Sequence, residues 1–357
     1  MKLSDALGRL DISQLSGLAA ACRCECNPHS KHELIQSLYV RLTRRSFFSE
    51  RFASMSAEEK RFLLQLTGES KTEYGKGALY VKTRLAGEKK LAGGAMILRA
   101  MEGGWLYRTR HEPEVYSMPD DIRMGWRRYL HKLAEQLAFA GAEPEWYRDE
   151  THVLAEDLLV FLHFVKKNNP PLSKENVLYR NHQQQIMGML SVAEELPGKG
   201  EWRFGYGRRF NEYPDRFALL YDYAYANRLI QEEDANQLYL TDEGHKLLLS
   251  ASGTLEDVSE PLFIYWKTAY SRPIPTINGL LSFFSGMASW TEETALIETV
   301  KELVSPYYYD SFADIIQRRL LKMLVHTGIL QKGTYGSSAV YRLSVWGNFI
   351  INKYTKL

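Results

Sequence analysis

The tetrapeptide Asp242-Glu243-Gly244-His245 has the residue types of a helicase DExH box, whose carboxylates hold magnesium and polarise the attacking water. Phosphoryl transfer also needs a phosphate-binding loop, and the chain contains no GxxxxGK[ST] pattern. A structural interpretation explains more, because Thr241 or Asp242 would cap a helix that follows a strand, as Ser344 would later in the chain. We therefore expect no helicase motor and no enzymatic activity.

A cluster of soft metal ligands lies near the N-terminus: Cys22, Cys24, Cys26, His29 and His32. These side chains could hold zinc in a tetrahedral site, although C-x-C-x-C is not the usual two-residue knuckle spacing. Cys22 also continues the apolar stripe of Leu15 and Leu18, so buried or half-exposed thiols at a helix end are the alternative. Whether the cysteines bind metal stays open, and we assign no metal and no cofactor.

Three stretches, beginning at Met96, Leu219 and Leu320, share the order helix, strand, turn, strand. The second and third align in detail, with these pairs of residues in register: Leu229 and Ile329, Ile230 and Leu330, Leu240 and Leu343, Thr241 and Ser344, Gly244 and Gly347. This order forms the second half of a winged helix, and the copies lie roughly a domain length apart. The first copy is looser than the other two.

The sequence therefore predicts a mainly α fold with small β-wings, made of three tandem winged-helix modules with a helical segment before the first. The predicted domains are residues 1–147 for the helical segment and first module, 148–252 for the second module and 253–357 for the third. Residues 3–66 show helical periodicity, and Ser56 with Glu59 forms a capping box. The acidic stretch Ala251–Glu260 is predicted to be the linker before the third module.

The composition is that of an ordinary globular protein, with 357 residues, 45% hydrophobic side chains and a net charge of only +2. A strongly basic, duplex-coating protein is excluded, so any nucleic-acid contact must come from a local patch. The N-terminal stretch lacks the apolar core of a signal peptide, and no window is apolar enough to span a membrane. Three closely spaced cysteines make no disulfide framework, and we expect a cytoplasmic protein.

The segment Leu172-Ser173-Lys174-Glu175-Asn176-Val177-Leu178-Tyr179-Arg180 resembles a signature of bacterial helicase-associated proteins related to the N-terminal region of XPB-type helicases. In that family it precedes a helix and a winged-helix ending similar to Leu240–Gly244, although Ser173 stands where the family has Thr and Asn176 where it has Gly. The resemblance implies a cytosolic bacterial protein of tandem winged helices. It also implies that the protein works with DNA, duplex or forked, or with a helicase or other DNA-processing partner.

A winged helix contacts DNA mainly through the helix before its wing. In the third module this helix carries Gln317, Arg318, Arg319 and Lys322, and the three cations are predicted to form an exposed strip that meets phosphates. A plain solvated helix face is the alternative. The matching helix of the second module, from Asp215, is acidic and aromatic, and the first module offers little beyond Arg99.

Cations and aromatic rings alternate in a second candidate patch: Lys199, Trp202, Arg203, Phe204, Tyr206, Arg208, Arg209 and Phe210. Such rings could stack on unpaired bases. In the alternative, the rings fold onto their own domain and the arginines stay in water. The acidic run Glu232-Glu233-Asp234 is predicted to be a solvated wing turn.

Two functions follow from these features. The first is a non-enzymatic DNA-binding accessory protein of repair, recombination or transcription that works beside a helicase, with Gln317, Arg318, Arg319, Lys322, Arg208, Arg209 and Trp202 on the nucleic acid. The second is a protein-interaction adaptor whose winged helices bind partners through Tyr- and Trp-rich faces.

Overall fold

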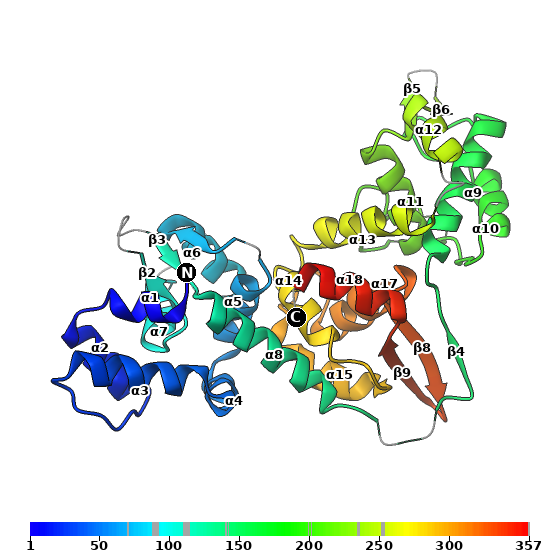
Figure 1. Ribbon diagram of the computed structural model, residues 1–357. Helices are drawn as coiled ribbons and strands as arrows, with labels where there is room; N and C mark the ends of the chain where they lie inside the picture. Colours follow the sequence, from blue (N-terminus) through cyan, green and yellow to red (C-terminus); the bar gives the residue numbers. More distant parts are fainter. Residues whose placement is uncertain are drawn as a thin grey trace. The chain divides into compact units, whose positions relative to one another are not determined.

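A computed structural model describes residues 1–69, 71–87, 93–109, 115–139, 141, 143–198, 200, 202–233, 236–250 and 254–355. The chain is mainly helical, with small sheets between the helices (Figure 1). This agrees with the mainly α fold predicted from the sequence. No helix within these ranges is long and apolar enough to cross a membrane.

The chain forms two compact units. Unit 1 comprises Met1–Gly141, Ile274–Ser305 and Ile351–Leu357, and unit 2 comprises Ala142–Pro273 and Pro306–Ile350. The predicted third domain, residues 253–357, is thus divided between the two units. The division into three consecutive modules stays a prediction.

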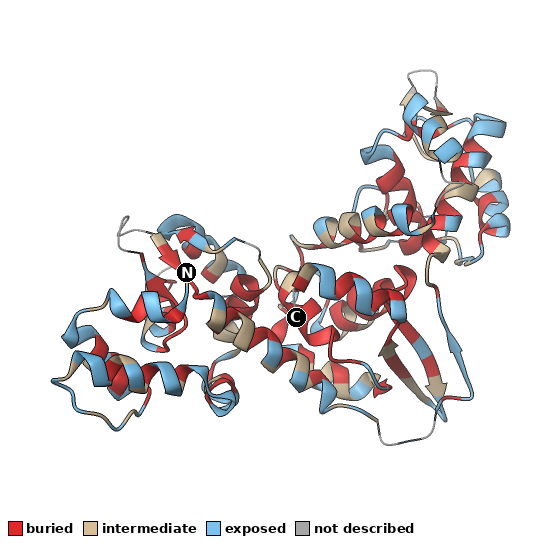
Figure 2. Cartoon of the chain, viewed as in Figure 1, coloured by how far each residue is buried: buried red, intermediate tan, exposed pale blue. Residues whose placement is uncertain are grey.

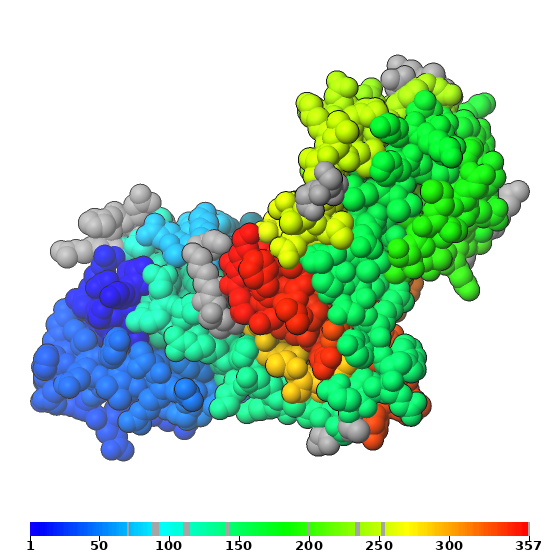
Figure 3. All heavy atoms as spheres, turned by 45° about the vertical axis from the view of Figure 1, so that its right-hand side comes forward, coloured from blue at the N-terminus to red at the C-terminus, as the bar shows by residue number. Residues whose placement is uncertain are grey.

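Unit 1 begins with five helices: α1 (Leu3–Gly8), α2 (Ile12–Ala21), α3 (Lys31–Thr43), α4 (Arg45–Ser54) and α5 (Ala57–Thr67). The predicted helical segment and its capping box are confirmed: the Glu59 amide donates to Ser56 Oγ and the Ser56 amide donates to Glu59 Oε2. Each helix turns apolar residues inward, as Leu34 and Leu38 of α3 show. In Figure 3 these helices, in blue, form part of the surface of unit 1.

A small sheet follows α5 in unit 1. The chain order is β1 (Glu73–Gly75), α6 (Lys76–Leu85), α7 (Gly93–Glu102), β2 (Tyr107–Arg108), β3 (Val115–Ser117) and α8 (Asp120–Glu135). Strand β3 lies between β1 and β2, antiparallel to both, so that Tyr116 is opposite Tyr74 and Arg108. The first sequence copy, which begins at Met96, contains β2 and β3, and residues 110–114 lie outside the described residues.

A later part of the chain completes unit 1 with α14 (Ile277–Phe284), β7 (Thr291–Glu292), α15 (Glu293–Val300) and a 3-10 turn η1 (Lys301–Leu303). Helix α14 packs against α5 and α8. Its residues are buried nearly throughout, so α14 has the character of a core helix.

Unit 2 contains a second run of helices and strands: β4 (Trp146–Arg148), α9 (Val153–Asn168), α10 (Arg180–Met189), α11 (Asp215–Ala226), β5 (Ile230–Glu233), β6 (Gln237–Leu240), α12 (Asp242–Ser250) and α13 (Glu256–Tyr270). Strands β5 and β6 form an antiparallel hairpin, and an isolated bridge joins Pro171 to Gln237 of β6. Helix α11 is buried along almost its whole length (Figure 2). The described residues between α10 and α11 contain no helix or strand.

Helix α13 corrects the predicted linker. The sequence placed a linker over Ala251–Glu260, but α13 already begins at Glu256, and Ala251–Gly253 lie outside the described residues. Glu256 and Asp257 occupy the first turn of α13, where negative charge stabilises the positive end of the helix dipole. The acidity that suggested a solvated linker is therefore a helix-start signal.

The remainder of unit 2 is a continuous helical run and a long hairpin. The run consists of α16 (Phe312–Asp314), a π-helical segment η2 (Ile315–Leu321) and α17 (Lys322–His326). Strand β8 (Leu330–Tyr335) pairs with β9 (Ser338–Leu343) on one side and β4 on the other, before α18 (Val345–Thr355) (Figure 1).

The alignment of the second and third sequence copies is confirmed in atomic detail. The Gly244 amide donates to Thr241 Oγ1 at 3.1 Å, and the Gly347 amide donates to Ser344 Oγ at 2.7 Å. A Cβ atom on Gly244 would collide with the carbonyl oxygen of Leu229, and one on Gly347 would collide with that of Ile329. Both glycines are therefore required by the same close approach of helix to backbone.

We predict that Gly244→Ala and Gly347→Ala each lower the free energy of unfolding by about 1–3 kcal/mol, because a backbone carbonyl must move. Gly188→Ala in α10 is the matched control, since no atom lies within 4 Å of the position that its new methyl group would occupy. That substitution should raise stability by up to about 1 kcal/mol through helix propensity. Urea unfolding of the three variants checks the prediction, and equal effects at all three positions would contradict it.

Candidate functional site

Arg319 is the centre of a buried polar network in unit 2. Its side chain is only 1% exposed. Its Nε donates to Asp310 Oδ2 at 2.8 Å, and its Nη2 donates to Asp310 Oδ1 at 3.2 Å and to the carbonyl oxygen of Phe204 at 2.6 Å. The predicted exposure of Arg319 is wrong, because these acceptors draw the guanidinium inward. The π-helical turn also departs from the 3.6-residue period on which the exposed strip was based.

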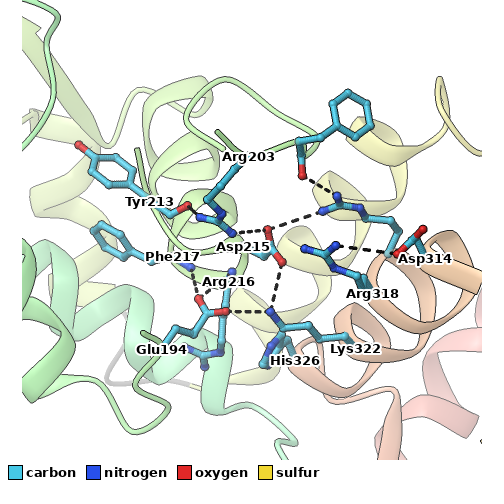
Figure 4. A network of polar contacts seen from close by, with 12 residues as sticks. Glu194, Arg203, Tyr213, Asp215, Arg216, Phe217, Asp314, Arg318, Lys322 and His326 are labelled. Carbon is cyan, nitrogen blue, oxygen red and sulfur yellow. Dashed lines mark hydrogen bonds and ion pairs between the residues drawn. The ribbon is translucent and has the colours of Figure 1, made fainter. Parts of the chain in front are cut away.

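The other residues of the predicted strip divide between the network and the solvent. Lys322 Nζ lies 3.1 Å from Glu194 Oε1 and 3.2 Å from Asp215 Oδ2, so its charge is neutralised although the side chain is partly exposed (Figure 4). Arg318 is exposed, and its Nη1 lies 3.9 Å from Asp314. Gln317 is partly exposed. The predicted continuous cationic face is therefore reduced to Arg318.

Asp215, the first residue of α11, pairs with three cations of this network. Its carboxylate lies 3.2 Å from Arg203, 3.2 Å from Lys322 and 3.6 Å from Arg319 (Figure 4). Burial alone would raise the pKa of Asp215, but Lys322 and Arg319 outweigh burial and hold this pKa below its ordinary value. The network thus connects α11 to the helical run of α16, η2 and α17.

A second buried cluster lies beside the first. Arg216 is 2.5 Å from Asp157 Oδ2 and 3.5 Å from Glu150 Oε2, and His326 Nδ1 lies 3.0 Å from the same Glu150 oxygen. Burial alone would raise the pKa of Glu150, but the hydrogen bond with His326 and the nearby cations hold it below its ordinary value. Charged side chains of α9, α11 and α17 are thereby paired inside unit 2.

Arg208 and Arg209 of the second candidate patch share one carboxylate. Arg208 forms a bidentate pair with Glu232, at 2.9 Å and 2.6 Å, and Arg209 Nη2 donates to Glu232 at 2.9 Å. Glu232 is buried, so the prediction of a solvated acidic turn is wrong for this residue. Asp234 and Lys199 lie outside the described residues. The alternative that the arginines stay in water is wrong for Arg209, which is buried.

Trp202 has a different environment from the arginines, because its side chain is 67% exposed. Its ring meets that of Tyr309 edge to face, with centroids 4.8 Å apart. Tyr308 and Tyr309 are 79% and 71% exposed, and the Phe204 ring lies within 6.3 Å of all three rings of Tyr307–Tyr309. We call these five residues, Trp202, Phe204, Tyr307, Tyr308 and Tyr309, the aromatic surface.

A tight turn presents the tyrosines of the aromatic surface. Tyr307 and Asp310 exchange backbone hydrogen bonds of 3.1 Å and 3.0 Å, which leaves Tyr308 and Tyr309 at the tip. Tyr308 has φ +50°, in the left-handed region that costs energy for a residue with a Cβ. Asp310, which closes this turn, is the residue that Arg319 binds. Arg319 also binds the carbonyl of Phe204, so one guanidinium positions both segments of the aromatic surface.

A cavity of about 290 Å³ opens beside the aromatic surface. Its lining includes Phe204, Tyr206, Phe210, Tyr307, Tyr308 and Arg272. Arg272 is exposed and makes no ion pair with any of the described residues. Rings and one free guanidinium therefore meet in a concave site.

Sequence reasoning found Trp202 but missed the three tyrosines. The run Tyr307-Tyr308-Tyr309 stands before the predicted helix that carries Gln317, and three consecutive large rings were the available signal. Arg272 gave no signal, because its neighbours on the surface come from distant parts of unit 2.

Two further candidates from the sequence are the tetrapeptide Asp242–His245 and the cysteine cluster near Cys22, and the structure gives each of them a structural role. Thr241 caps α12, so Asp242 and Glu243 lie in the first turn of that helix. Cys22 follows the last residue of α2 and is buried, and burial raises the pKa of its thiol to about 11. Among the described residues no cluster of three or more His, Cys, Asp or Glu side chains is arranged to hold a metal ion.

Comparison with known proteins gives no match, either to a protein-family model or to a curated protein.

We predict that Arg319→Ala lowers the free energy of unfolding by about 3–5 kcal/mol, because Asp310 and Asp215 are then left buried with too little positive charge. Arg318→Ala is the matched control one residue earlier, and its effect should stay within about 0.5 kcal/mol. Urea unfolding measures both values. Similar small effects for the two variants would contradict the role assigned to Arg319.

Proposed function

We propose that this protein is a non-enzymatic interaction adaptor built from tandem winged-helix modules, and that its aromatic surface contacts a partner protein. The chain order supports the modules. In unit 1, α5, β1, α6, α7, β2 and β3 follow one another in winged-helix order, and β3 pairs with β1 as well as β2. In unit 2, α9, α10, α11, β5 and β6 repeat this order, and the Pro171 bridge to Gln237 takes the place of the first strand.

The helix before each wing is poorly suited to a polyanion. Helix α7 exposes Leu98, and its Arg99 lies 2.5 Å from Glu59. Helix α11 is buried almost entirely, and Arg319 in η2 points into the network around Asp310. Affinity for a nucleic-acid backbone comes from cations that neutralise phosphates. Carboxylates of the protein itself already neutralise most of these cations.

The aromatic surface is the single observation that carries the proposal. Contiguous exposed apolar patches mark interaction sites, and Trp and Tyr rings dominate the energetic centres of protein interfaces. Here three such exposed rings belong to one cluster joined through Phe204, and one of them, Tyr308, has a strained left-handed backbone conformation. A strained backbone that displays a large ring to solvent is consistent with selection for binding.

The proposal predicts site-specific capture of a partner. A photoreactive benzoyl-phenylalanine in place of Tyr309 should crosslink to one protein in cells, and the same group in place of the exposed Tyr39 of α3 should not. Trp202→Ala should abolish the crosslink without unfolding the protein, because the Trp202 side chain is largely exposed. Mass spectrometry identifies the product. Equal crosslinking from both positions, or none from Tyr309 in the folded protein, would contradict the adaptor function.

DNA binding beside a helicase remains the second candidate function. The observation that favours it is the exposure of Arg318 on the helix and Lys332 on the following strand β8, the two elements with which a winged helix contacts a duplex.

If DNA binds there, Arg318→Ala with Lys332→Ala should reduce the magnitude of the negative slope of log K against log salt by about 0.9 for each phosphate that the protein no longer neutralises. Lys166→Ala with Lys167→Ala is the control, because these exposed cations lie in α9 and outside that helix and strand. Titration of duplex, forked and single-stranded DNA measures the slopes. An unchanged slope in the first double variant would exclude this face as the DNA-binding surface.

A further inference from the structure

We infer that the aromatic surface and its cavity bind an extended proline-rich segment that carries an acidic residue. This inference rests on the adaptor function proposed above, and it names the chemical class of the partner. Aromatic-lined grooves recognise the polyproline II helix because proline rings pack flat against Tyr and Trp faces. That helix is already ordered before binding, so little conformational entropy is lost.

The ring geometry fits such a ligand. Trp202 and Tyr309 meet at an interplanar angle of 78°, and Tyr307 and Tyr308 meet at 83°, with centroids 4.8 Å apart in both pairs. Two rings at nearly right angles form a corner between the face of one and the edge of the other. Corners of this kind can receive the compact pyrrolidine rings that project from a polyproline II helix, and the cavity of about 290 Å³ lies next to Tyr307 and Tyr308.

Free hydrogen-bond donors accompany these rings. Within the described residues, neither the indole N–H of Trp202 nor the hydroxyl groups of Tyr308 and Tyr309 donate to any acceptor. A polyproline II helix has no internal hydrogen bonds, so its carbonyl oxygens are available acceptors. Proline itself lacks a backbone N–H, which suits a surface that offers donors and rings.

The positive charge of Arg272 favours an acidic residue beside the prolines of the ligand. Arg272 lines the cavity with no acidic partner among the described residues, whereas the nearby Arg203 and Arg319 are paired with carboxylates. A glutamate or aspartate of the ligand can therefore pair with Arg272, and a lysine or arginine would be repelled. Among the described residues that line the cavity, Arg272 is the one cation without an ion-pair partner, and a single cation favours a peptide over the phosphate chain of single-stranded nucleic acid.

The surface is organised before any ligand arrives. Asp310 closes the turn that carries Tyr308 and Tyr309, and Arg319 ties Asp310 to the carbonyl of Phe204. Rings held in place on the protein and a stiff ligand both reduce the entropy lost on binding. Tyr308 keeps its left-handed backbone without a ligand, which is consistent with this organisation.

Fluorescence anisotropy with the full chain tests the inference. The probes are a labelled oligoproline peptide with one central glutamate, the same peptide with lysine, a glycine-serine peptide with the glutamate, and single-stranded oligothymidylate. The glutamate oligoproline should bind about tenfold more tightly than the lysine peptide, and the glycine-serine peptide should bind least. Arg272→Glu should reverse the preference for glutamate over lysine, and Trp202→Ala should weaken both oligoproline peptides.

Failure of the inference can be distinguished from failure of the adaptor function. If no oligoproline peptide binds while the Tyr309 crosslink persists, the partner is a protein of another class and the inference is overturned. If oligothymidylate binds and Trp202→Ala abolishes that binding, the surface takes unpaired bases and the inference is likewise overturned. A preference for glutamate that is the same in Arg272→Glu would also overturn it.

Discussion

The buried ion pairs of Arg319 determine what unit 2 shows to the solvent. A guanidinium taken out of water is costly unless carboxylates and carbonyls satisfy it, and Asp310, Asp215 and Phe204 supply those groups. In return, three stretches that are separate in sequence are fixed together: the loop that carries Trp202, the start of α11 and the turn of Tyr307–Asp310. The aromatic surface exists because these stretches meet. Its rings owe their positions to a charge that lies beneath them and does not itself face the solvent.

Because these charged side chains pair with one another inside unit 2, the fold of the protein does not by itself predict what it binds. The winged-helix modules that we propose belong to a fold used widely on DNA, yet a fold alone does not establish what its surfaces bind. Here Arg208 and Arg209 share the carboxylate of Glu232, and Lys322 pairs with Asp215, so these cations make ion pairs within the domain. Large rings and Arg272, which has no ion-pair partner among the described residues, are what unit 2 offers to a partner of low charge.

Local features were the ones that could be predicted from the sequence. The mainly helical fold, the Ser56 capping box and the shared positions of Thr241 and Ser344 depend on neighbours a few residues away, so spacing is enough to find them. The position of Arg319 depends on Phe204, which is 115 residues distant, and on a π-helical turn that no residue pattern announces. Glu232 was misjudged for the same reason: its burial is set by arginines of a distant loop. The candidate site was therefore only partly visible, through Trp202.

The division of the chain between the units has a consequence for synthesis on the ribosome. Unit 1 takes its residues from the first 141 positions, from Ile274–Ser305 and from Ile351 onward, so its core waits for helix α14 and for the Thr355 carbonyl that accepts from Arg127. Domains usually fold as they emerge, N-terminal first. In this chain the unit that starts first is completed last, and unit 2 is translated almost entirely during that wait. Until α14 is translated, the apolar faces of α5 and α8 lack the helix that packs against them. During this time the nascent polypeptide must avoid association of these faces with other apolar surfaces.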